Sequence, residues 1–176
     1  MRRFSLPLVL LMALHAGCWP FTQPTFTDAP QAHKIVSDAL DQAQIVERPV
    51  FLLFTENDFW SHQLEDYHAD EDVARLLDKY FIVVMLPIDA MVGAQQMYHE
   101  RGNDRGVPAY TIVDSHGALL ADSGDAGQNI GFPNTDDEVH RYLEMLKTAC
   151  PEMTDEEQAL LQKKLEAHRV GDVTNH

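Results

Sequence analysis

The sequence is poor in cysteine and in positive charge. Its 176 residues include two cysteines, and 13 Lys and Arg side chains stand against 28 Asp and Glu side chains, giving a formal net charge of −15. Two cysteines cannot build a disulfide framework or a cysteine zinc site. Nucleic acids and anionic lipid surfaces are bound by clustered Lys and Arg, so neither is an expected partner. The length and the 45% hydrophobic content predict one globular domain.

Familiar catalytic patterns are also missing. The sequence has no G-x-S-x-G motif, and Ser61 and His62 are neighbours that would point about 100° apart on a helix, so they cannot act as nucleophile and base. The glycine spacing fits neither the dinucleotide fingerprint nor the P-loop. A flexible loop of turn formers is predicted instead at Gly124, Gly127, Gln128, Asn129 and Gly131. A serine hydrolase is not expected, and no cofactor is expected.

The first 17 residues have the features of an export signal. A positively charged start is followed by an apolar run at residues 8–14 and by the small residues Ala16 and Gly17. The run is too short to span a bilayer as a helix. The mature chain is therefore expected outside the cytoplasm, with residues 18–31, which contain three prolines, as a semi-rigid linker.

Residues 14–18 resemble the lipobox of bacterial lipoproteins, except that His15 stands where an aliphatic residue is usual. The resemblance implies acylation of Cys18, which would become the mature N-terminus. The alternative is simple cleavage near Ala16 or Gly17. The protein is thus expected in the periplasm or anchored to a membrane, and in contact with lipid only through such an N-terminal anchor.

Hydrophobic periodicity predicts alternating helices and strands. Strands are predicted at about 50–54, 81–86, 110–113 and 118–121, and the first, apolar throughout, is expected at the centre of the sheet. Helices are predicted at about 33–46 and 91–100, in the segment that ends at Tyr80, and in the segments that follow Thr135 and Thr154. The last two begin with capping boxes. A parallel strand–helix–strand crossover followed by an antiparallel hairpin predicts an α/β sandwich with a mixed sheet.

Three segments together resemble proteins of the thioredoxin-like family. They are residues 48–55 (RPVFLLFT) followed by Trp60, residues 70–77 (DEDVARLL) and residues 106–114 (GVPAYTIVD). The similarity is to secreted thioredoxin-like domains and covers about residues 33–150. Its most specific part is Gly106, Val107 and Pro108, which resembles the cis-proline loop of the family. The resemblance implies a thioredoxin-like domain at 32–150, a C-terminal helical extension at 151–176, and a Pro108 that faces the start of the helix after the central strand.

The redox motif of the family is replaced in this sequence. Redox members carry Cys-x-x-Cys after the central strand, where the helix N-terminus lowers a thiol pKa. Taking Trp60 as the anchor, Asp58 and Ser61 occupy the two cysteine positions, and neither side chain can exchange electrons. Asp58 is predicted to cap the helix instead. The resemblance therefore implies a redox-inactive protein without dithiol oxidoreductase activity.

The resemblance also implies a groove in which an extended polypeptide lies against the cis-proline loop. An envelope protein or peptide is the expected partner. The residues predicted to form this binding groove are Phe59, Trp60, His62, Val107, Pro108 and Tyr110.

The alternative function is a thiol–disulfide or metal-handling envelope protein that uses other residues of the same scaffold. Carboxylate and imidazole groups that could hold Zn²⁺ or Cu²⁺ occur at Asp58, His62, Asp66, His68 and His99. A solvated helix face is the preferred interpretation, and no metal ligand is assigned. Cys150, at the negative end of a predicted helix, is interpreted as a semi-buried apolar residue. An intermolecular disulfide through Cys150 stays open.

Overall fold

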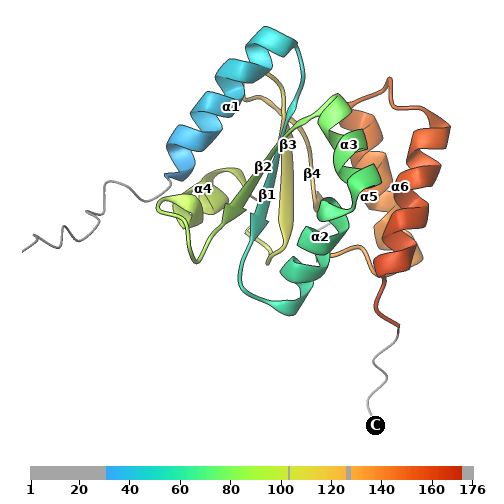
Figure 1. Cartoon of the computed structure of the whole chain (residues 1–176). Helices are drawn as coiled ribbons and strands as arrows, with labels where there is room; N and C mark the ends of the chain where they lie inside the picture. The colour runs from blue at the N-terminus through green and yellow to red at the C-terminus, as the bar shows by residue number, and fades with distance from the viewer. Residues whose placement is uncertain (1–30, 103, 126–127, 172–176) are drawn as a thin grey trace, which may run out of the picture.

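The computed structural model describes residues 31–102, 104–125 and 128–171 (Figure 1). The predicted export signal, Cys18 and the linker up to residue 30 lie outside the described residues. In chain order the elements are α1 (Ala32–Val46), β1 (Val50–Thr55), α2 (Phe59–Ala69), α3 (Glu71–Tyr80), β2 (Ile82–Pro87), α4 (Ala94–Arg101), β3 (Ala109–Val113), β4 (Leu119–Asp122), β5 (Gly124–Asp125), β6 (Gln128–Asn129), α5 (Asp136–Ala149) and α6 (Asp155–His168).

Four strands form a mixed sheet in the order β2-β1-β3-β4. β1 and β2 are parallel and are joined by the crossover through α2 and α3, whereas β3 is antiparallel to both β1 and β4. β1 lies inside the sheet and all of its residues are buried, as its uniformly apolar sequence predicts. β2 is an edge strand and ends at Pro87, which lacks a backbone N–H to donate. The predicted α/β fold with a mixed sheet is confirmed.

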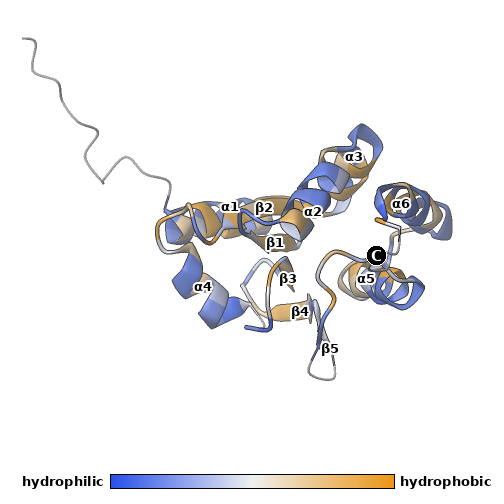
Figure 2. Ribbon diagram, turned by 90° about the horizontal axis from the view of Figure 1, so that it is seen from below, coloured by the Kyte–Doolittle hydropathy of each residue, from blue (hydrophilic) through white to orange (hydrophobic). Residues whose placement is uncertain are grey.

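Helices cover both faces of the sheet. Successive residues of β1 alternate between the two hydrophobic cores, because neighbouring side chains of a strand point to opposite faces. Leu52 and Phe54 face the core under α1 and α4, whereas Phe51 and Leu53 face the core under α2, α3, α5 and α6. Figure 2 shows predominantly hydrophilic α4 and α6 at the outside of the molecule, and a hydrophobic β4 at the edge of the sheet.

The helix between β1 and β2 is interrupted at Asp70. The backbone of Asp70 leaves the helical region (φ −58°, ψ 128°), and its side chain accepts hydrogen bonds from the N–H groups of Asp72 and Val73. Asp70 therefore ends α2 and caps α3 in the same position. Apolar spacing alone gives no sign of this break, because Val73, Leu76 and Leu77 belong to a stripe that suits one longer helix.

The described residues of the glycine-containing segment after β4 include regular structure, and Gly127 lies outside the described residues. β5 and β6 pair as a short antiparallel hairpin, with Gly124 opposite Asn129. The interpretation of Gln128 and Asn129 as parts of a flexible loop is therefore corrected. Helix α6, in the predicted C-terminal extension, buries Leu161 and Leu165 in the same core as α2 and α5. Within the described ranges no helix has the length and apolar character needed to cross a membrane.

Candidate functional site

The head of α2 is organised by Asp58 and Ser61. Asp58 Oδ1 accepts hydrogen bonds from the N–H groups of Trp60 (2.8 Å) and Ser61 (3.2 Å), so Asp58 is the N-cap of this helix. The hydroxyl of Ser61 donates to Asp58 Oδ2 at 2.5 Å and accepts from the N–H of Glu56 at 3.2 Å. Ser61 is fully buried. A carboxylate and a hydroxyl thus satisfy each other at the positive end of the helix dipole.

The loop before β3 approaches α2 with a cis peptide bond between Val107 and Pro108. Gly106 has a φ of 102°, a conformation that favours glycine, and its N–H donates to the Tyr98 hydroxyl at 2.9 Å. The side-chain amide of Asn129 donates to the carbonyl groups of Gly106 (2.9 Å) and Pro108 (2.8 Å). The loop is therefore fixed on both sides of Val107. The main-chain groups of Val107 make no hydrogen bond with any other described residue.

A pocket of about 320 Å³ lies between the head of α2 and this loop on one side and the segment from Ile130 to Glu138 on the other. The indole of Trp60 stacks on the ring of Phe132, with ring centroids 6.1 Å apart and planes inclined by 20°. Glu138 is the charged residue of the lining, and its carboxylate accepts hydrogen bonds from the N–H groups of Asn134 and Thr135. The complete lining is Trp60, Val107, Pro108, Ile130, Gly131, Phe132, Asn134, Thr135 and Glu138.

Three of the six residues predicted for the groove line this pocket, namely Trp60, Val107 and Pro108. Phe59 is 54% exposed beside the pocket and packs edge-on against Trp60, with ring centroids 5.1 Å apart. His62 lies outside the lining, where its ring nitrogens are 3.0 Å from Asn57 Oδ1 and 3.3 Å from Glu65 Oε2.

Tyr110 is not on the groove surface, and its placement there is corrected. Its side chain is fully buried, and its hydroxyl donates to the carbonyl of Gly131, so it supports the pocket wall from inside the core. The opposite wall, from Ile130 to Glu138, was missed at the sequence level. The capping box at Thr135 and Glu138 was a usable signal, because it places a helix start directly after an apolar segment.

The histidines considered as metal ligands do not come together. His68 is buried against Phe51, its Nε2 is 3.3 Å from the Tyr142 hydroxyl, and burial lowers its pKa to about 3. His99 belongs to α4, on the other face of the sheet, and pairs with Asp104 at 3.0 Å. Among the described residues no group of three His, Cys, Asp or Glu side chains could hold a metal ion.

Cys150 is buried where α5 ends, not at the groove. Burial is the main cause that raises its thiol pKa to about 12. The groove lies at the other end of α5, which is about 20 Å away for a helix of 14 residues. The thiol is therefore protonated at neutral pH and remote from Trp60 and Pro108.

No family model matches the sequence, and no curated protein matches it. Among solved structures, a disulphide isomerase from Xylella fastidiosa Temecula1 has a TM-score of 0.51 and 18% identity, over 81% of this chain and 97% of that chain. A DsbH oxidoreductase has a TM-score of 0.48 and 18% identity, over 66% and 81%. A thioredoxin from Thermus thermophilus has a TM-score of 0.43 and 21% identity, over 80% and 93%.

The first of these likenesses, together with the observed sheet order, defines the class: the chain is an α/β protein with the thioredoxin-like fold. Within that class, it carries Asp58 and Ser61 at the head of the helix that follows the central strand, and its two cysteines, at positions 18 and 150, form no Cys-x-x-Cys motif.

Proposed function

We propose that this protein is a redox-inactive thioredoxin-fold domain of the bacterial cell envelope that binds an extended segment of another protein or peptide. The binding site is the groove between the head of α2 and the Val107–Pro108 loop. One observation carries the proposal: the groove has aromatic and apolar walls, while a hydrogen-bonded Asp58–Ser61 pair occupies the place of a reactive dithiol.

The redox-inactive character follows from the chemistry of the side chains. Thiol–disulfide exchange begins with a thiolate, and neither Asp58 nor Ser61 can supply one. Cys150 cannot replace them, because its thiol is buried and its pKa is raised. The proposal therefore assigns binding, not electron transfer, to this site.

Binding of an extended chain is supported by exposed aromatic area and by main-chain groups that pair with no described residue. The N–H and C=O of Val107 are available to pair with the backbone of a bound strand. Trp60 is 41% exposed although its ring is large and apolar, and such surface favours an interaction site. The pocket is at the small end of the range for ligand sites, about 300–1,000 Å³, which suits one or two side chains.

The negative charge of the protein limits which partner segments can bind. With a net charge of −15 and Glu138 as the charged residue of the pocket, an acidic segment would be repelled. The proposal therefore includes a neutral or basic partner segment with an apolar side chain. The envelope location rests on the export features of residues 1–18.

The test uses reduced, carbamidomethylated ribonuclease A, an unfolded basic polypeptide without free thiols, labelled with fluorescein. We expect saturable binding in fluorescence anisotropy and a loss of at least about tenfold in affinity in Trp60→Ala, since a buried aromatic anchor contributes 1–3 kcal/mol or more. Ile45→Ala is the matched control, because Ile45 is 82% exposed on α1, over the other face of the sheet.

Three outcomes contradict the proposal. Absence of saturable binding to the unchanged protein would refute the binding of an extended segment. Equal affinity of Trp60→Ala and the unchanged protein would remove the groove as the binding site. Insulin reduction above the uncatalysed rate by the unchanged protein would refute its redox-inactive character.

A further inference from the structure

Helix α6 and the two residues after it contact both of the segments that carry Trp60 and Asn134 at the groove. One wall belongs to α2, which presents Trp60 from its first turn. The other wall is the segment that leads into α5, where Asn134 and Thr135 line the pocket. These two segments are far apart in the sequence, and residues 161–170 contact both: α2 at its C-terminal end, and the second wall at Asn134.

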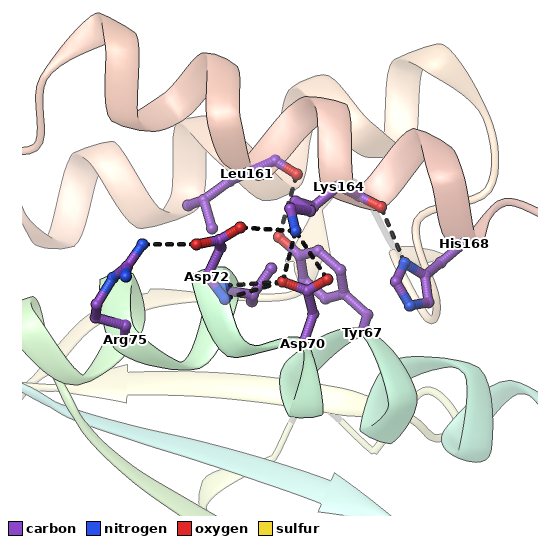
Figure 3. Close-up of polar contacts among 8 residues, drawn as sticks. Tyr67, Asp70, Asp72, Arg75, Leu161, Lys164 and His168 are labelled. Carbon is purple, nitrogen blue, oxygen red and sulfur yellow. Dashed lines mark hydrogen bonds and ion pairs between the residues drawn. The ribbon is translucent and has the colours of Figure 1, made fainter.

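The contacts with α2 lie at its C-terminal end (Figure 3). Lys164 Nζ lies 3.0 Å from both carboxylate oxygens of Asp70, the residue that ends α2, and 2.8 Å from Asp72 Oδ2. The hydroxyl of Tyr67 donates to the carbonyl of Leu161 at 3.4 Å. The rings of Tyr67 and His168 meet edge to face, with centroids 5.8 Å apart. The end of α2 opposite Trp60 is therefore held by one side of α6.

The contacts with the second wall follow directly after α6. Asn134 pairs with the main chain of Val170 through both groups of its side-chain amide: Oδ1 accepts from the N–H at 2.8 Å and Nδ2 donates to the carbonyl at 3.1 Å. Arg169 donates from Nε to the carbonyl of Asn134 and from Nη1 to Asp136 Oδ1, both at 2.7 Å. Three hydrogen bonds thus fix Asn134, before α5, to the residues that follow α6, and a fourth fixes Asp136, the first residue of α5.

We infer that α6 is a clamp that sets the separation of the two groove walls. Leu161 and Lys164 hold α2, Arg169 and Val170 hold Asn134, and the helix between these anchors is a stiff connector because its backbone groups are paired internally. Loosening one anchor therefore loosens the distant wall as well. The effect on ligand binding rests on the proposed function, whereas the mechanical coupling does not.

The experiment compares hydrogen–deuterium exchange of the purified protein with that of two variants. Lys164→Met removes the ionic anchor on α2 without touching the segment at 130–138. A chain ending at His168 removes Arg169 and Val170 without changing any residue of the pocket lining. Lys34→Met is the control for removing a lysine charge, because Lys34 forms an exposed ion pair within α1, which lies on the other face of the sheet.

We expect both variants to exchange at least about tenfold faster in the peptides that cover residues 130–138 and residues 59–69. Exchange in α1 should stay unchanged, and Lys164→Arg should restore protection. The inference is overturned if each variant loosens only the wall it touches, or if neither wall changes while α1 remains protected. The exchange measurement needs no ligand. If exchange changes as expected while the labelled ribonuclease A fails to bind, the proposed function is refuted and the clamp is not.

Discussion

The hydroxyl of Ser61 lies 2.5 Å from the carboxylate of Asp58, so these two side chains are bonded to each other across the first turn of α2. The same carboxylate accepts two main-chain N–H groups of that turn. Asp58 therefore caps the helix and also accepts a hydrogen bond from a buried hydroxyl. This pair gives the head of α2 a structural function that can be measured separately from binding.

Replacing Asp58 should destabilise the fold. Asp58→Ala removes an N-cap and leaves the buried hydroxyl of Ser61 without its acceptor, so we expect a loss of about 1–3 kcal/mol in the free energy of unfolding. Urea denaturation measures it. Asp38→Ala on α1, which removes an exposed ion pair, should stay within about 0.5 kcal/mol of the unchanged protein. A cost for Asp58→Ala as small as that of the control would contradict the assigned capping function.

Two substitutions should introduce redox chemistry. Asp58→Cys combined with Ser61→Cys places two thiols at the positive end of α2, where the helix dipole lowers a thiol pKa. In a Cys150→Ser background, we expect this double variant to reduce insulin in the presence of dithiothreitol faster than either single variant. Failure of the double variant, although it is folded and forms the disulfide, would show that the surrounding groove no longer supports exchange.

The thiol of Cys150 should react only after unfolding. Burial raises its pKa to about 12, so the reactive thiolate is scarce at pH 8 and the sulfur is shielded. In a Cys18→Ser variant, labelling with Ellman's reagent should be slow in buffer and complete within minutes in concentrated urea. Fast labelling of a variant with Cys18→Ser in buffer, where Cys150 is the only thiol, would contradict the buried position.

Acid should destabilise the protein through His68. Its pKa is about 3 when folded and near 6.5 when unfolded, so the unfolded chain binds the extra proton. The stability is fully present above pH 6.5 and is lost as the pH falls towards 3, by about 2 kcal/mol at pH 5. Urea denaturation between pH 4.5 and 7 checks this, and His68→Leu should flatten the profile.

Glu157 titrates in a different pH range and provides a comparison for the effect of His68 on stability. Lys79 and Tyr80 hold the pKa of Glu157 at about 2, so its stabilisation is present above about pH 4.5 and falls away only below that value. Lys79→Met should therefore change the profile below pH 4.5 and leave the region from 5 to 6.5 as it was. A profile that His68→Leu does not alter in that region would remove His68 as the cause.

Local patterns predicted the parts of this fold that depend on near neighbours. The apolar run of β1 and the capping boxes at Thr135 and Thr154 are contained in a few consecutive residues, and each lies where the sequence places it. The break at Asp70 was missed although its signal is also local, because the Asp70 carboxylate caps α3 by accepting from the N–H groups of Asp72 and Val73.

The candidate site was predicted on one side only. Trp60 and Pro108 lie in segments whose sequence patterns are recognisable. Ile130 and Phe132 reach the pocket through the pairing of β5 with β6, and a short glycine-rich sequence does not predict such a pairing. Tyr110 was placed wrongly because β3 is buried on both faces, so the sequence of this strand does not tell which side chains reach a surface.

The burial of Leu161 and Leu165 beside Tyr67 and Tyr142 bears on how this protein should be produced and dissected. A fragment that stopped at residue 150 would expose these aromatic side chains to water and favour aggregation, so a stable fragment is expected to include helix α6 through His168. Affinity tags are better attached after the final residue through a spacer than substituted for any part of the last helix.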